Sequence, residues 1–223
     1  MSKFVTDVLN KDVVDIVRRM SALAEYREPG IKNHLERIRG YCHVIARGLD
    51  LSPQEAEIVA NASQLHDIGE IGIPDALLNK AGKLAPYEWE VVKRHPIIGA
   101  EILRGSPSIL LQAGEIIALS HHERWNGSGY PYGLKGEDIP LSGRICALAD
   151  IFDALTTKRP YKDEIPVDEA YDLILESSGV LFDPQVVQVF RDNFDELLII
   201  RQNNIYTQTN VIPPHPLLPS PPA

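Results

Sequence analysis

Two pairs of adjacent polar residues, His66-Asp67 and His121-His122, carry the strongest chemical signal in this 223-residue chain. Adjacent side chains leave a helix roughly 100° apart, so a neighbouring histidine and aspartate cannot share one packing role. They can bind neighbouring metal ions, with the carboxylate bridging the two. A glycine-rich run, NGSGYP, follows the second pair. This pattern is typical of sites that hydrolyse phosphate esters with the help of metal ions.

Several histidines fall at predicted helix ends or beside turn residues, where ligands can face a cleft: His66, His95, His121 and His122. They are far apart in the sequence, so different helices must bring them together. Any one of them is compatible with a structural role, but burying so many polar groups without metals would be costly. Imidazoles suit transition metals, whereas carboxylates such as Asp67 and Asp150 suit harder cations. The mixed set favours iron, manganese or zinc over a site for magnesium alone.

The spacing of the apolar residues predicts an all-α protein, because alternation typical of strands is nowhere sustained. Residues typical of helix starts and stops predict helices at residues 5–26, 31–49, 53–66, 86–103, 107–122, 141–157, 166–177 and 183–199. One such signal is Ser52, an expected N-cap with Glu55 three residues after it. A glycine-rich loop is predicted at about 124–140. The helices must therefore position the histidines, and the loop must lie beside them.

Three parts are predicted along the chain: an amphipathic N-terminal helix at 1–26, a helical domain at 27–200 and a proline-rich tail at 201–223. The first helix is expected to pack on the domain or on another copy of the chain, so a homodimer stays open. Prolines favour extended polyproline conformations in the tail. We interpret it as a flexible end or a strap on the surface, with a recognition peptide as the alternative.

The composition narrows the partners and the compartment. A net charge of −9 argues against binding to polymeric nucleic acid, which rests on many cationic contacts to phosphates. A small phosphorylated ligand is compatible, because bound cations make one pocket positive. Neither a membrane span nor a secretory signal is recognisable. Cys42 and Cys146 are expected to be buried, reduced thiols, so the predicted location is the cytoplasm.

Four longer segments resemble the successive motifs of the HD-GYP domain, a branch of the HD phosphohydrolase superfamily: HDIGEIGIPDALLNKAGKL, KRHPIIGAEIL, HHERWNGSGYPYGLKGEDIPLSGRICALADIFDALTTKRPYK and SGVLFDPQVVQVF. The resemblance covers about residues 27–195. It implies an all-helical HD-domain bundle with a glycine-rich GYP loop and a centre of two or three divalent metal ions, most commonly iron or manganese. It also implies hydrolysis of the bacterial second messenger cyclic di-GMP to linear pGpG, with GMP as a further product left open.

Carried over residue by residue, the resemblance implies catalytic roles for His66 and Asp67, with Asp67 bridging two metal ions. The implied metal ligands are His34, His66, Asp67, His95, His121, His122 and Asp150. Arg159 and Lys162 match positions that contact the substrate phosphate, and Tyr130 of the Gly-Tyr-Pro signature is expected to shape the ligand surroundings. A solvated basic helix end is the alternative explanation for the two cations, and turn formation alone is the alternative for the loop.

Glu70 departs from the family pattern, which has a lysine at this position. Members with a third metal ion commonly supply a glutamate before the first histidine, where this chain has Gly30. We hypothesise that Glu70 supplies the missing carboxylate, either as a metal ligand or by holding a ligand histidine. The rival hypothesis is reduced or altered activity. The alternatives for function are then a weakly active or inactive module that binds a cyclic dinucleotide or a signalling partner, or a hydrolase of another cyclic nucleotide or dinucleotide.

Overall fold

The computed structural model describes residues 11–24, 31–80, 82–158 and 164–205. Across these ranges the regular structure is entirely helical, apart from one isolated bridge between Ser178 and Phe182. The predicted all-α fold is confirmed. No helix within the described ranges is long and apolar enough to cross a membrane.

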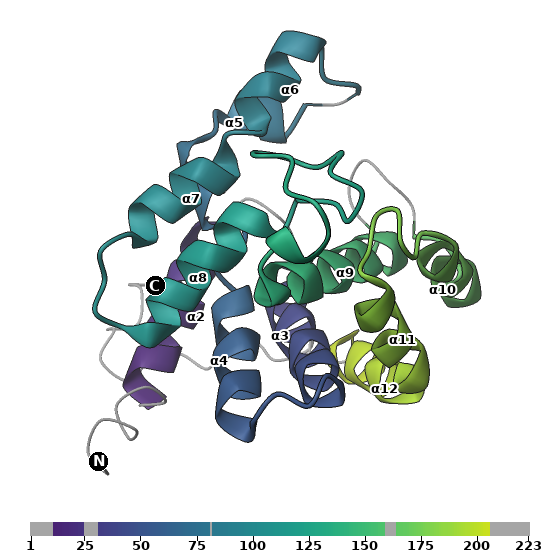
Figure 1. Cartoon of the computed structure of the whole chain (residues 1–223). Helices are drawn as coiled ribbons and strands as arrows, with labels where there is room; N and C mark the ends of the chain where they lie inside the picture. The colour runs from purple at the N-terminus through teal and green to yellow at the C-terminus, as the bar shows by residue number, and fades with distance from the viewer. Residues whose placement is uncertain (1–10, 25–30, 81, 159–163, 206–223) are drawn as a thin grey trace, which may run out of the picture.

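Nine longer helices in the described ranges build the body of the domain (Figure 1). They are α2 (Lys11–Ala24), α3 (Ile31–Gly48), α4 (Pro53–Ser63), α7 (His95–Leu103), α8 (Ile109–Ser120), α9 (Leu141–Thr156), α10 (Val167–Glu176), α11 (Pro184–Asp192) and α12 (Phe194–Ile205). Four short elements complete the described part: η1 (Ile68–Gly72), α5 (Asp75–Leu78), α6 (Pro86–Val92) and η2 (Gly136–Asp138). Figure 1 shows α5 and α6 standing away from the body, above α7.

Helix α3 runs through the middle of the domain and packs against α4, α9 and α12. Aromatic side chains fill the contact between α3, α9 and α11. Tyr41 meets Phe152 with ring centroids 5.2 Å apart, and Phe152 meets Phe190 at the same separation. All three rings are fully buried. Burial of large aromatic rings dominates the energy of such a core, so α3 and α9 have a firmly set spacing.

The start of α4 follows the prediction. Ser52 accepts a hydrogen bond from the amide of Glu55, and the Glu55 carboxylate accepts one from the amide of Ser52. This reciprocal capping satisfies two amides that the first turn would otherwise leave without partners. Pro53 follows at the first helical position. The cap defines the start of the helix whose far end leads to His66.

Two predicted helices are broken in the structure, so those predictions were wrong. The segment predicted as one helix at 86–103 forms α6 and α7, separated at Lys93 and Arg94. Pro96 explains the break, because its ring cannot continue a preceding helix without a clash. The segment predicted at 183–199 divides into α11 and α12 at Asn193, whose side chain donates to the carbonyl of Val189 and ends α11.

Helix α2 packs on the domain through Val17, Ser21 and Ala24, which are buried. It contacts α3, α4 and η1. The predicted helical residues 5–10 and 25–26 lie outside the described residues, as does the tail from 206 onward. Helix α12 continues through Arg201. The predicted division into three parts therefore stays a prediction.

Cys42 and Cys146 are buried and free, as predicted. They come from α3 and α9, which pack against each other. The neighbouring thiol of Cys42 and burial hold the pKa of Cys146 well above its usual range. The Cys146 thiol thus keeps its proton, and both cysteines are packing residues.

Candidate metal centre

Three buried histidines have their ring orientation set by their own helices or turns. In each, Nδ1 lies within hydrogen-bond distance of a backbone carbonyl three residues earlier: His66 with Ser63 at 3.0 Å, His95 with Val92 at 2.9 Å and His121 with Ala118 at 3.0 Å. A carbonyl oxygen only accepts, so each Nδ1 carries the proton. In the neutral ring, Nε2 is then a lone-pair donor. The chain thus selects the tautomer that a metal ion requires.

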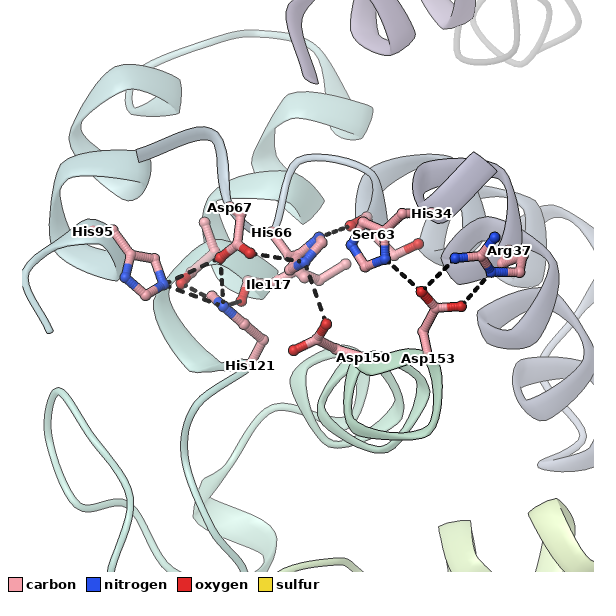
Figure 2. Close-up of polar contacts among 11 residues, drawn as sticks. His34, Arg37, Ser63, His66, Asp67, His95, Ile117, His121, Asp150 and Asp153 are labelled. Carbon is pink, nitrogen blue, oxygen red and sulfur yellow. Dashed lines mark hydrogen bonds and ion pairs between the residues drawn. The ribbon is translucent and has the colours of Figure 1, made fainter. Parts of the chain in front are cut away.

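The Asp67 carboxylate lies at the meeting point of these rings (Figure 2). Oδ1 is 3.2 Å from Nε2 of His95 and 3.2 Å from Nε2 of His121, whereas Oδ2 is 3.2 Å from Nε2 of His66. Neutral imidazole lone pairs and carboxylate oxygens repel each other unless a positive charge lies between them. The donor set therefore fits divalent cations, which satisfy all of these atoms at once.

The predicted ligands divide into two groups. The first contains Asp67, His95, His121 and His122, and the second contains His34, His66 and Asp150. Within each group the candidate ligand atoms all lie within 4.8 Å of one another. Because the two oxygens of Asp67 face different groups, the carboxylate is oriented as a bridging ligand would be. All seven ligands implied by the family resemblance thus come together.

His34 is oriented by Asp153, whose Oδ2 lies 2.7 Å from His34 Nδ1. Arg37 donates to the same carboxylate, with Nη2 at 2.8 Å from Oδ2 (Figure 2). Burial raises the pKa of Asp153, but the hydrogen bonds from Arg37 and His34 outweigh it and hold this pKa well below its ordinary value. The ionised carboxylate directs Nε2 of His34 toward the second group. Sequence reasoning did not assign this role to Asp153.

The pKa values of the residues in the first ligand group are shifted in different directions. Burial raises the pKa of Asp67, but the charge of His66 and the hydrogen bonds from the histidines hold it well below its usual range. Burial lowers the pKa of His121, and burial with the charge of His121 lowers that of His122 further. Burial also opposes protonation of His95, yet its hydrogen bond to Asp67 leaves its pKa raised. At neutral pH the group thus offers an ionised carboxylate and at least two neutral imidazoles.

Gly69 allows η1 to approach α7 closely enough for this geometry. A Cβ at this position would lie 2.0 Å from the carbonyl oxygen of His95 and 2.4 Å from the amide of Gly99. No real side chain tolerates such a distance to backbone atoms. The glycine that follows the His-Asp pair therefore brings Asp67 to His95.

A sequence profile of the family described as "HD domain" matches residues 18–186. The chain belongs to the HD domain family. Among its curated relatives is the cyclic di-GMP phosphodiesterase response regulator RpfG of Xanthomonas campestris pv. campestris, 47% identical over 173 residues. A cyclic di-GMP phosphodiesterase of Thermotoga maritima is 46% identical over 176 residues. A 3'3'-cGAMP-specific phosphodiesterase 2 of Vibrio cholerae is 41% identical over 187 residues. The family match and these relatives confirm the resemblance to HD-GYP domains.

These alignments cover 78%, 79% and 84% of the chain, but only 46%, 48% and 36% of the relatives, respectively. The chain thus spans less than half the length of the curated relatives it matches. A solved cyclic GMP-AMP specific phosphodiesterase of Vibrio cholerae, V-cGAP3, superposes with a TM-score of 0.61 at 23% identity, over 86% of this chain and 53% of the other. The HD domain of Listeria monocytogenes PgpH in complex with cyclic-di-AMP gives 0.51 at 18% identity, over 87% and 99%. These structures share the helical fold.

In this HD domain the GYP loop is held against the second histidine pair. Glu123 is buried, and its carboxylate accepts hydrogen bonds from the amides of Tyr132 at 2.8 Å and Leu134 at 3.0 Å. Tyr130 stacks on His122 with ring centroids 4.7 Å apart. Burial and the negative charges of the centre raise the pKa of Tyr130, so its hydroxyl stays protonated at neutral pH. Sequence reasoning missed Glu123, although an acidic residue directly after the His-His pair was a usable signal.

Gly129 is required where this loop crosses back over its own start. A Cβ there would lie 2.4 Å from the amide of Arg124 and 2.5 Å from Cα of Glu123. Gly129 thus allows a close backbone approach, and this approach brings Tyr130 over His122.

A cavity of about 230 Å³ opens beside the centre. Its lining includes His121, His122 and Asp150 from the metal groups and Tyr130 from the loop. Trp89 of α6 also lines the cavity, and no sequence motif predicted this position. The cavity joins the candidate metal centre to the outside of the domain.

The remaining predicted site residues are not part of the two groups. Glu70 is half-buried in η1, and its charge contributes to the raised pKa values of His95 and Tyr130, so it lies in their electrostatic reach. Among the described residues it is in neither ligand group. Arg159, Lys162 and Gly30 lie outside the described residues.

Proposed function

We propose that this HD domain is a metal-dependent phosphodiesterase that hydrolyses cyclic di-GMP to linear pGpG. The observation that carries the proposal is the Asp67 carboxylate, whose two oxygens face separate groups of metal-ligating side chains. A pair of such groups is suited to phosphodiester cleavage. The choice of substrate is supported by relatives at 46% and 47% identity that are named for cyclic di-GMP.

The proposed ligands are His95, His121 and His122 on one side, His34, His66 and Asp150 on the other, and Asp67 between them. The mixed nitrogen and oxygen donors suit iron or manganese. Bound cations would activate water at neutral pH and offset charge on the phosphate.

The chain's own groups would then orient the substrate. The protonated Tyr130 hydroxyl is suited to donate a hydrogen bond to a phosphate oxygen, because its raised pKa keeps the proton in place. Arg159 and Lys162 are the proposed further phosphate contacts.

Cyclic GMP-AMP is a second candidate substrate, because a relative named as specific for it is 41% identical over 187 residues. A cyclic dinucleotide of either kind is a small phosphorylated ligand, compatible with a net charge of −9. That charge supports the proposal that polymeric nucleic acid is not a partner. The free, buried thiols support the proposed cytoplasmic location. A homodimer or a signalling partner stays a prediction.

The test begins with protein purified without oxygen, followed by measurement of bound metal and chromatography of cyclic di-GMP and cyclic GMP-AMP after incubation with Fe²⁺ or Mn²⁺. We expect two or three equivalents of metal and conversion of cyclic di-GMP to pGpG. Nucleotide binding without hydrolysis at full metal content would instead support the inactive binding module. Faster turnover of cyclic GMP-AMP would reassign the substrate and leave the chemistry unchanged.

Glu70 remains a proposed contributor to the first ligand group, acting on His95 or on a metal ion. Its charge already raises the pKa of His95. The competing proposal is that Glu70 weakens substrate binding, since a carboxylate near the centre repels phosphate.

A further inference from the structure

Trp89 is an exposed aromatic residue on the wall of the candidate active-site cavity. It lies on the seven-residue helix α6, and 42% of its surface is exposed. It lines the same cavity as His122 and Asp150. A large indole exposed on a surface is unremarkable, but one exposed inside a concave site is suited to contact a ligand.

A series of rings leads from the metal ligands to this indole. Tyr130 stacks on His122 with centroids 4.7 Å apart and an interplanar angle of 26°. Trp89 meets Tyr130 edge to face, at 5.9 Å and 80°. The indole thus lies one ring beyond the side chain that we propose as a phosphate contact. A flat group attached to a phosphate at the centre would reach it.

The remaining walls of the cavity are largely apolar. Ala147 and Ile151 contribute from α9, and Leu181 and Phe182 contribute from the turn before α11, beside the charged Glu123 and Arg124. One end of the cavity therefore carries candidate metal ligands, and its sides carry aromatic and aliphatic groups. This distribution matches a ligand with a charged phosphate and an uncharged heteroaromatic base.

Helix α6 holds Trp89 in a defined place. Glu88 accepts a hydrogen bond from the amide of Ala85 at 2.7 Å, which caps the helix, and its carboxylate also pairs with Lys80. Helix α7 follows after a short turn and begins with His95. The indole and a candidate metal ligand are thus on consecutive elements, so the wall and the centre have a set separation.

We propose that Trp89 binds a purine base of the substrate by stacking, and that α6 is the base-binding wall of the site. The inference rests on the proposed function and adds the residue that binds the base. Stacking on an aromatic side chain suits every purine, because each base has a π-face. Trp89 therefore contributes affinity for cyclic purine dinucleotides in general rather than a choice between guanine and adenine.

The first experiment records the fluorescence of Trp89 in a Trp125→Phe background, where it is the sole tryptophan of the chain. Trp125 lies under Arg144 and does not line the cavity. Cyclic di-GMP, cyclic di-AMP and cyclic GMP-AMP are mixed with Mn²⁺-loaded protein by stopped flow, so that binding precedes turnover. We expect rapid quenching by each of them and none by dimethyl phosphate, which has no base. Absence of quenching by all three dinucleotides would overturn the inference.

The second experiment compares three variants by steady-state kinetics with cyclic di-GMP. Trp89→Ala is expected to raise KM about 10-fold, with a smaller change in kcat and unchanged metal content. Trp89→Phe is expected to restore most of the affinity, because it keeps an aromatic face. Tyr87→Ala is the matched control, since Tyr87 is 73% exposed on the same helix and does not line the cavity. Equal KM values for Trp89→Ala and Tyr87→Ala would refute base stacking.

The two proposals fail in different ways. If the metal-loaded wild-type protein does not hydrolyse cyclic di-GMP, the proposed function fails, and the fluorescence titration still decides the role of Trp89. If hydrolysis is observed and neither quenching nor a change in KM follows, only the base-binding wall fails.

Discussion

The metal centre and the outer wall of the cavity are built in contrasting ways. In the centre, His66, His95 and His121 are buried, and each is oriented by a backbone carbonyl of its own helix or turn. In the wall, Trp89 is exposed on a short helix and Tyr130 lies on a loop. One carboxylate supports each of these outer elements: Glu88 caps the helix of Trp89, and Glu123 accepts hydrogen bonds from the loop of Tyr130. The difference indicates that the candidate metal ligands are held by the buried core of the domain. The residues proposed to recognise the ligand lie on peripheral elements, which local substitutions can alter.

The largest expected effect comes from Asp67→Asn, because an amide cannot bridge two cations as a carboxylate does. We expect loss of most bound metal and a decrease in turnover of about 1000-fold or more. Metal analysis and chromatography of cyclic di-GMP measure both. Glu101→Gln is the control, since Glu101 is exposed on α7. Full metal content and turnover in Asp67→Asn would contradict the assignment of Asp67 as a bridging metal ligand.

Asp153→Ala is expected to destabilise the fold, because the buried Arg37 would lose the carboxylate with which it forms an ion pair. Breaking such a buried pair costs about 3–5 kcal/mol of unfolding free energy. Urea unfolding of metal-free protein measures the loss without a contribution from metal binding. Asp172→Ala, at an exposed position of α10, should change the free energy by less than about 0.5 kcal/mol.

A double substitution sharpens this prediction. Replacing Asp153 by Leu and Arg37 by Met removes both charges, so it should be less destabilising than Asp153→Ala. Equal losses in the single and the double variant would indicate that packing, rather than the broken ion pair between Asp153 and Arg37, determines the cost.

Metal affinity is expected to fall as the pH falls. The pKa of His95 is raised above its ordinary 6.5, so in the metal-free protein a proton competes with the metal ion from above pH 6.5 downward. The pKa values of His121 and His122 are lowered, so these two compete less. Affinity should decrease about 10-fold per pH unit for each proton displaced. Titration against a chelator at a series of pH values measures this, and a flat profile would be inconsistent with a protonated His95.

Glu123→Gln tests the support of the outer wall. The amide keeps one acceptor for the loop amides of Tyr132 and Leu134, but loses the charge and the second acceptor. We expect KM for cyclic di-GMP to rise about fivefold with unchanged metal content. Glu137→Gln, exposed in the same loop, is the control. Loss of metal in Glu123→Gln would show that the wall and the centre are not separable.

The smallest effect is expected at Glu70, which lies between the two regions. Glu70→Gln should change metal affinity by about fivefold or less, because a partly exposed charge contributes under about 1 kcal/mol. Isothermal titration with Mn²⁺ measures it. A strong rise in turnover in Glu70→Lys would support the rival hypothesis, in which the carboxylate impairs substrate binding.

Much of the fold was predictable because its helices have clear apolar spacing and caps, as at Ser52. The breaks at Lys93–Arg94 and at Asn193 were missed, since apolar periodicity continues across both. The candidate ligands were found through the order of the motifs, although no single histidine was informative by itself. The contact between His34 and Asp153 spans 119 positions, and only tertiary packing brings the two together.

The outer wall was the least predictable part for a related reason. Trp89 falls in a short helix with no sequence pattern of its own, and its importance depends on Tyr130 lying opposite. In the sequence, Glu123 cannot be distinguished from an exposed acidic residue, because its role depends on hydrogen bonds from the folded loop. Roles that arise from contacts between a helix and a loop leave no periodic signal in the chain.

The carbonyl-oriented histidines have a consequence for how the protein matures in the cell. Each ring is oriented by backbone atoms that are in place once the helices form, so we expect the chain to complete its folding before it acquires a cation. Loading then becomes a separate event, governed by which divalent ions are available at that moment. A signalling enzyme assembled this way would couple its output to the supply of metals as well as to its nucleotide.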